Sequence, residues 1–67
     1  MNRRPVNSSN VSSVGWEEGV LEVEFRGGKL YRYEDVPESE YRALLGADSP
    51  GKYLLTHIDG VYQHTRI

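Results

Sequence analysis

A strict alternation of apolar and charged residues, followed by two glycines, constrains the fold of this chain more than any other feature. In segment 21–26, leucine, valine and phenylalanine alternate with two glutamates and an arginine. Successive side chains of a strand point to opposite faces, so this pattern predicts a strand with one buried and one wet face. Gly27-Gly28 interrupts the pattern, and the β-prone stretch 29–33 resumes it. The sequence therefore predicts a β-hairpin over residues 20–34.

The residues leave two registers open for this hairpin. A loop made of the two glycines alone places Tyr31 and Tyr33 on the wet face, as a stacking platform of the kind that binds single-stranded nucleic acid. A three-residue loop that includes Arg26 pairs Val23 with Tyr31 and Leu21 with Tyr33, so both tyrosines enter the core. One residue of slip moves a whole strand's side chains to the other face. The shortage of large apolar groups in 67 residues favours the core register.

Two short helices are predicted after the hairpin. Pro37 suits the first helical position, where its missing N–H costs nothing, and Gly46 suits the end of that helix. Ser49 is a good N-cap for the second helix, which Gly60 ends. The predicted inward-facing residues of the second helix are Leu54, Leu55 and Ile58.

The remaining segments are short. Residues 11–16 are a weak strand candidate and 61–67 a short final strand, whereas the polar residues 1–10 are expected to be frayed. Strands precede helices, so the predicted fold class is α+β: a small antiparallel β-meander followed by two short α-helices packed on one face. Residues 1–67 are expected to form one domain.

Composition narrows the possible functions. The chain has no cysteine, which excludes disulfides and cysteine-ligated zinc. Eight Lys and Arg against ten Asp and Glu give a net charge of −2, so any nucleic-acid surface must be a local basic patch. No apolar run approaches the ~20 residues of a membrane span, and none follows the basic N-terminus. We expect a cytoplasmic protein without a membrane role.

Recognisable catalytic and metal-binding patterns are lacking. Residues 46–52 match the spacing of a phosphate loop, but a helix precedes them, Tyr53 follows the lysine and Pro50 lacks an N–H. The serines near the N-terminus have no base at a recognisable spacing. His57 and His64 share no evident carboxylate partner. We therefore expect no enzyme, no metal and no cofactor.

Aromatic and basic side chains supply the candidate ligand-binding residues. Lys52 lies in the first turn of the second predicted helix, where an anion meets free N–H groups and a cation together; the alternative is a solvated lysine. An extended tail places Tyr62, His64 and Arg66 on one face. The candidate set consists of Tyr31, Arg32, Tyr33, Lys52, Tyr53, His57 and Arg66.

Several segments resemble the KTSC domain family. They are Ser8-Ser9, Val14-Gly15-Trp16 (with Trp16 where a tyrosine is more usual), 25–33 (FRGGKLYRY), Val36-Pro37, Tyr41, 49–53 (SPGKY), His57-Ile58 and Tyr62. KTSC domains are named for their place at the C-terminus of some lysyl-tRNA synthetases, and they also occur as free-standing small bacterial or phage proteins. The resemblance implies a stand-alone form of that domain and, through this context, RNA binding. It does not imply aminoacylation, because no catalytic synthetase domain is present.

Two function classes follow. The first is a non-catalytic binding module for RNA, or for a nucleotide or similar anionic ligand. The second is a protein–protein interaction or homo-oligomerisation module with no nucleic-acid role, which the acidic balance favours. A continuous basic patch on the surface would support the first class, and an apolar patch the second.

Overall fold

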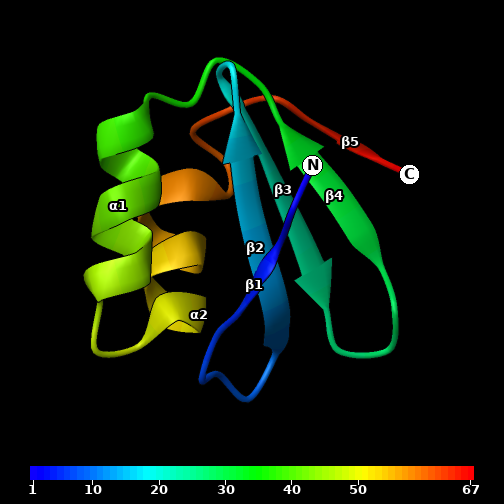
Figure 1. The fold of residues 1–67 in the computed structure, drawn as a ribbon, viewed down its shortest axis with the longest axis vertical. Coiled ribbons are helices and arrows are strands. Elements are labelled where there is room, and N and C mark those ends of the chain that lie inside the picture. The colour runs from blue at the N-terminus through cyan, green and yellow to red at the C-terminus, as the bar shows by residue number, and fades with distance from the viewer.

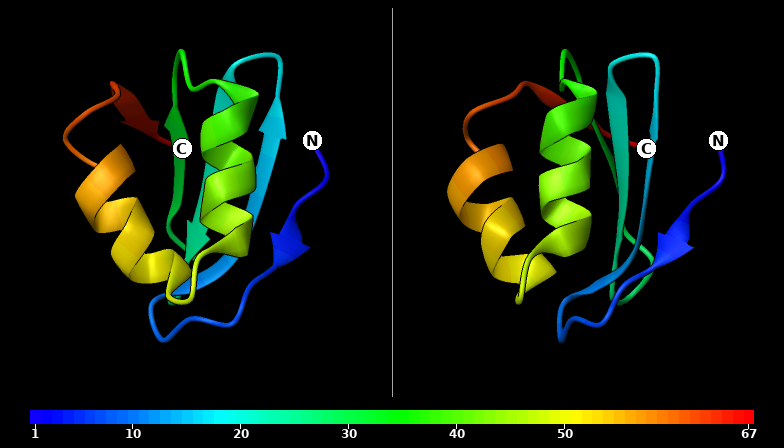
Figure 2. Two further views of the ribbon diagram at one scale, coloured as in Figure 1. Left: turned by 90° about the vertical axis from the view of Figure 1, so that its left-hand side faces the viewer. Right: turned by 60° about the vertical axis from the view of Figure 1, so that its left-hand side comes forward.

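The computed structural model describes all 67 residues as one antiparallel sheet with helices on one face (Figures 1 and 2). The five strands are neighbours in chain order, β1-β2-β3-β4-β5. Four of the five strands precede the helices and β5 follows them, and the α+β class is confirmed. The elements are β1 (Arg4–Pro5), β2 (Val11–Glu17), β3 (Val20–Phe25), β4 (Leu30–Tyr33), α1 (Glu38–Gly46), α2 (Pro50–Tyr53), a π-helical turn η1 (Leu54–Ile58) and β5 (His64–Arg66).

The β3–β4 hairpin adopts the three-residue loop. Val23 pairs with Tyr31 and Leu21 with Tyr33. Both loop glycines have a positive φ, 94° and 91°, which residues other than glycine rarely adopt. Tyr33 is 1% exposed and Tyr31 is half-buried. The core register is confirmed, so the two tyrosines do not form a platform on the uncovered face.

The core lies between the covered face of the sheet and the helices, as the two layers in Figure 2 show. Nine apolar residues are buried there: Val11, Val14, Leu21, Val23, Tyr33, Val36, Leu44, Leu54 and Ile58. None of the helices combines the length and the apolar character that a membrane crossing requires.

The helix termini follow the sequence signals closely. Ser49 caps α2 as predicted, because its hydroxyl accepts a hydrogen bond from the amide of Lys52 at 3.3 Å. Helix α1 begins one residue later than predicted, since Pro37 is its extended N-cap (ψ 153°) rather than its first helical residue. The predicted inward position of Leu55 is wrong: this side chain is 55% exposed.

Two residues of the N-terminal segment, Arg4 and Pro5, pair with the sheet as β1, whereas the sequence predicts that residues 1–10 are frayed. β1 pairs with Val14 and Ser13 of β2. The side chain of Arg3 crosses the outer face, defined as the face without helices, and contacts Glu22. This order comes from contacts with distant residues, which the local polar composition does not reveal.

Candidate functional site

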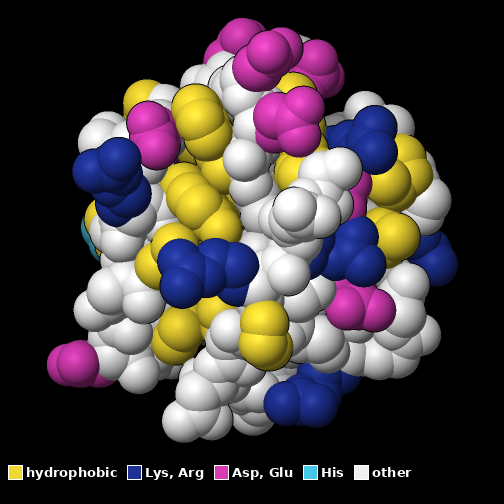
Figure 3. Space-filling model, viewed as in Figure 1, with side chains coloured by type: hydrophobic (Ala, Val, Ile, Leu, Met, Phe, Trp, Pro, Cys, Tyr) yellow, Lys and Arg dark blue, Asp and Glu magenta, His cyan; other side chains and the backbone are white.

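Acidic and basic side chains are separated along the molecule. Figure 3 shows acidic side chains gathered at the end where the β2–β3 turn and the β4–α1 connection lie. The β3–β4 loop, with Arg26 and Lys29, lies at the opposite end. Neither cation is part of an ion pair. A chain of net charge −2 thus has a basic corner. The exposed acidic residues at the end with the β2–β3 turn are Glu17, Glu18, Glu34 and Asp35.

A cleft of about 410 Å³ opens at this basic corner, and we call it the hairpin cleft. It lies between the β3–β4 hairpin, the loop before β2 and the end of η1. Its volume falls in the range of small-molecule sites. It is lined by Ser9, Asn10, Phe25, Arg26, Lys29, Tyr31, Tyr33, Leu55 and Asp59.

Aromatic rings line one side of the hairpin cleft and continue onto the edge strand β5. The Tyr31 ring meets Phe25 edge-on, with centroids 5.2 Å apart. It stacks on His64 at 5.0 Å with 9° between the planes. Tyr33 lies opposite His64 in the sheet, and their rings are 5.3 Å apart. Three adjacent strands therefore contribute to one aromatic row, in which Tyr33 is buried and Phe25 and Tyr31 are partly exposed.

A hydrogen-bonded carboxylate lies in the same cleft. The buried Tyr33 hydroxyl donates to Oδ1 of Asp59 at 3.2 Å. Burial, and after it the charge of Asp59, raises the pKa of Tyr33, so this hydroxyl keeps its proton and remains a donor. Oδ2 of Asp59 has no protein hydrogen-bond partner and no ion pair. Oδ1 is held by Tyr33 and keeps a second lone pair, and Oδ2 has no protein partner, so both oxygens can accept a hydrogen bond from a ligand.

The loop before β2 forms a further wall of the hairpin cleft by packing onto α2. The hydroxyl of Ser8 donates to Oδ1 of Asn10 at 2.9 Å and accepts from the amide of Val11 at 3.3 Å. The guanidinium of Arg26 donates to the carbonyl of Ser8 through Nη2 at 2.9 Å. Gly51 lies against this loop: a Cβ there would be 2.7 Å from the Ser8 hydroxyl and closer still to Asn10.

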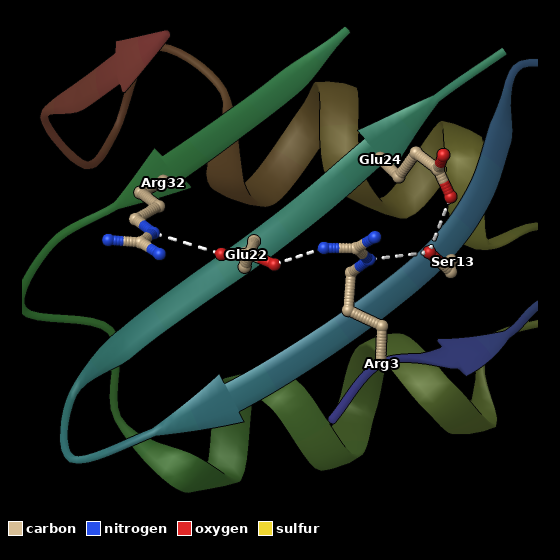
Figure 4. A network of polar contacts seen from close by, with 5 residues as sticks. All are labelled: Arg3, Ser13, Glu22, Glu24 and Arg32. Atoms are coloured by element: carbon tan, nitrogen blue, oxygen red, sulfur yellow. Dashed lines mark hydrogen bonds and ion pairs between the residues drawn. The ribbon is translucent and has the colours of Figure 1, made fainter. Parts of the chain in front are cut away.

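Arg32 lies on the outer face, away from the hairpin cleft. Its Nε donates to one oxygen of Glu22 at 2.9 Å, and Arg3 contacts the other oxygen (Figure 4). Arg3 also donates to the Ser13 hydroxyl at 3.0 Å, which donates to Glu24 at 3.0 Å. Burial alone would raise the pKa of Glu22, but the hydrogen bonds and charges of Arg32 and Arg3 outweigh it and lower this pKa. Arg32 is a partner of a buried acid.

Lys52, Tyr53 and His57 occupy a third place, on the exposed side of α2 and η1. The rings of Tyr53 and His57 stack with centroids 4.3 Å apart. The Tyr53 hydroxyl donates to Glu40, whose other oxygen accepts from Tyr62 at 3.1 Å. The bond to Glu40, followed by burial, raises the pKa of Tyr53 to about 12. Lys52 makes no ion pair. The tyrosines here tie α1 to the C-terminal half of the chain.

The family model of the KTSC domain matches residues 7–62 of this chain. The chain belongs to the KTSC domain family. A crystal structure of a KTSC domain protein from Yersinia pestis superposes on this KTSC domain with a TM-score of 0.92 and 33% identity, covering 98% of this chain and 96% of that one. An uncharacterized protein of Stutzerimonas stutzeri is 49% identical over 55 residues (79% of this chain, 78% of that protein). A protein of Tsukamurella paurometabola is 36% identical over 53 residues (76% and 79%).

The fold of this KTSC domain divides the seven sequence-predicted site residues among separate places. Tyr31 and Tyr33 line the hairpin cleft, and Arg66 is the exposed neighbour of Tyr31 on β5. Arg32 is on the outer face, and the remaining three are on α2 and η1. The sequence analysis did not include four polar residues that line the hairpin cleft: Asn10, Arg26, Lys29 and Asp59. Arg26 and Lys29 could have been found from the sequence, because they flank the glycine pair of the predicted hairpin loop.

Proposed function

We propose that this KTSC domain is a non-catalytic binding module for RNA or a nucleotide, and that the hairpin cleft is its binding site. The observation that carries the proposal is the aromatic row of Phe25 and Tyr31 beside two cations, Arg26 and Lys29, that have no ion-pair partner. Base stacking on an aromatic ring contributes about 1–3 kcal/mol. The same two cations line the cleft and supply the phosphate contacts that dominate nucleic-acid affinity.

The local charge distribution supports a polyanionic ligand despite the acidic balance of the chain. Four exposed carboxylates gather at the far end of the molecule, so these four repel a ligand at the hairpin cleft only weakly at physiological ionic strength, whereas Asp59 lies in the cleft itself. A larger cleft, of about 520 Å³, lies between β1 and the end of α1. It faces the carbonyl end of that helix, which disfavours an anion.

The kind of ligand, the stand-alone form of the domain and its cellular location are further parts of this proposal. The resemblance to the domain at the C-terminus of lysyl-tRNA synthetases favours RNA over a free nucleotide and implies the stand-alone form of that domain. Because the proposed ligand is RNA, we place the protein in the cytoplasm. The cleft lining holds no histidine or cysteine beside its one serine, Ser9, which supports binding rather than catalysis. The rival function, protein or self-association, draws on the exposed apolar side chains Leu55, Val61 and Ile67.

The proposal is tested by the affinity for a fluorescein-labelled single-stranded RNA of about eight nucleotides, measured by anisotropy at low salt. Lys29→Gln removes an exposed cation without breaking a side-chain hydrogen bond or an ion pair, so we expect weaker binding by about threefold to tenfold and a smaller salt dependence. Lys52→Gln is the matched control, because it removes the same charge from α2. It should leave the affinity unchanged.

Two results would contradict the proposal. If the wild-type protein binds no RNA or nucleotide at low salt, the hairpin cleft is not a nucleic-acid site, and the interaction-module alternative gains. If Lys52→Gln weakens binding while Lys29→Gln does not, the anion lies on the surface formed by α2 and η1 instead. Thermal melting of each variant separates a loss of binding from a loss of folding.

A further inference from the structure

The hairpin cleft holds hydrogen-bonding groups whose positions are fixed by the protein itself. The Tyr33 hydroxyl holds Oδ1 of Asp59, and the carboxylate belongs to a residue whose backbone is also fixed, because its amide donates to the carbonyl of Leu54 at 2.8 Å. On the opposite wall, the Ser8 hydroxyl holds Oδ1 of Asn10. The side-chain nitrogen of Asn10 makes no hydrogen bond with the protein. The cleft thus presents an oriented acceptor and an oriented donor.

An oriented carboxylate distinguishes the four nucleobases by their Watson–Crick edges. A carboxylate only accepts hydrogen bonds, and it binds best to two adjacent donors. Guanine has such a pair, the N1–H and the 2-amino group. Adenine and cytosine place a ring acceptor next to their amino group, and uracil places its single N–H between two carbonyl acceptors. Each of these three bases would turn at least one acceptor towards the Asp59 carboxylate.

We infer that the hairpin cleft selects guanine, with the Asp59 carboxylate accepting from N1–H and the 2-amino group. This inference rests on the proposed function and names its ligand class. Tyr31 supplies the stacking surface, Lys29 and Arg26 meet the phosphate, and the amide of Asn10 offers a donor to the O6 carbonyl. The negative charge of Asp59 contributes to selectivity, because it would weaken the binding of any phosphate ligand that lacks a guanine base.

The test is a titration of the intact protein with GMP, IMP, AMP, CMP and UMP, in which calorimetry or amide chemical shifts measure the affinity for each nucleotide. One bidentate pair gives about tenfold discrimination or more, so we expect GMP to bind at least tenfold tighter than AMP, CMP or UMP. IMP keeps N1–H but lacks the 2-amino group, and it should fall between GMP and AMP. Asp59→Asn turns a donor towards the base and should bring the ratio of GMP to AMP affinity close to one.

The control is Asp48→Asn, which removes one negative charge from the α1–α2 connection outside the hairpin cleft. It should keep the guanine preference. If the wild-type protein binds all the nucleotides with equal affinity, the guanine inference is overturned and the proposed function stands. If it binds none of them and no RNA, both are overturned. The comparison of bases uses the wild-type protein, so the inference can fail even if Asp59→Asn does not fold.

Discussion

Glu22 is the only buried charged residue in the protein, at 4% exposure, and it lies on the face of the sheet that no helix covers. Its burial comes from Arg3, which directly precedes β1, and from Arg32 of β4; each arginine binds one carboxylate oxygen (Figure 4). Breaking a buried pair by removing one partner is costly, because the remaining charge is left without compensation. Through Glu22, this network therefore joins β3 to β4 and to the segment that precedes β1.

We expect Glu22→Gln to lower the free energy of unfolding at pH 7 by about 1–3 kcal/mol, since hydrogen bonds to a charged group are lost. The pKa of Glu22 is lowered in the folded state. Its contribution is therefore fully present above the unfolded pKa of about 4.3 and disappears as the pH falls through the lower folded pKa. Urea unfolding of both proteins at pH 7 and at about pH 3 measures this difference, which should shrink in acid.

The control for this prediction is Glu38→Gln. Glu38 pairs with Arg42 on exposed helix surface, and such pairs contribute at most about 0.5 kcal/mol. Equal stability of Glu22→Gln and the wild-type protein at pH 7 would mean that the two arginines merely cover the sheet and do not stabilise the fold through Glu22.

Among the elements, the π-helical turn η1 forms the wall of the hairpin cleft that faces the β3–β4 hairpin. The bond from the amide of Asp59 to the carbonyl of Leu54 spans five residues. Leu54 and Ile58 face the core, whereas Leu55, the next residue round the turn after Leu54, faces the cleft. The wide turn also ends with Asp59 next to the Tyr33 hydroxyl. Single π-turns are frequent at functional sites, and here the turn supplies two cleft residues.

The packing of α2 against the loop before β2 depends on the missing side chain of Gly51. We expect Gly51→Ala to destabilise the protein by about 1–3 kcal/mol, because the new methyl group would overlap the polar atoms of Ser8 and Asn10. Gly46→Ala is the matched control: a Cβ there meets nothing within 4 Å, so the change should stabilise by about 0.4–1 kcal/mol. Thermal melts of the two variants should shift in opposite directions. A shift of the same sign would contradict the close contact.

At the scale of the whole molecule, β1 closes one edge of the sheet and brings Arg3 to Glu22. We expect a chain without residues 1–6 to fold with lower stability, because it loses both the β1 pairing and one partner of the buried carboxylate. In that shortened chain Glu22→Gln should cost less than in the full chain, since residues of one network are not additive. A double-mutant cycle measured by urea unfolding gives the coupling. Additive effects would show that Arg3 and Glu22 act independently.

Local signals determined the hairpin, the caps and the fold class. Each of these signals depends only on residues close in sequence, as in the alternation in 21–26, the glycine pair and the cap at Ser49. They can therefore be recognised from the sequence alone. The tertiary structure decided the register of Tyr31 and Tyr33, the docking of β1 and the outward position of Leu55. It alone brought together the parts of the hairpin cleft, which come from segments 9–10, 25–33 and 55–59. These features depend on contacts between residues far apart in the chain, and such contacts leave no periodic pattern in the sequence.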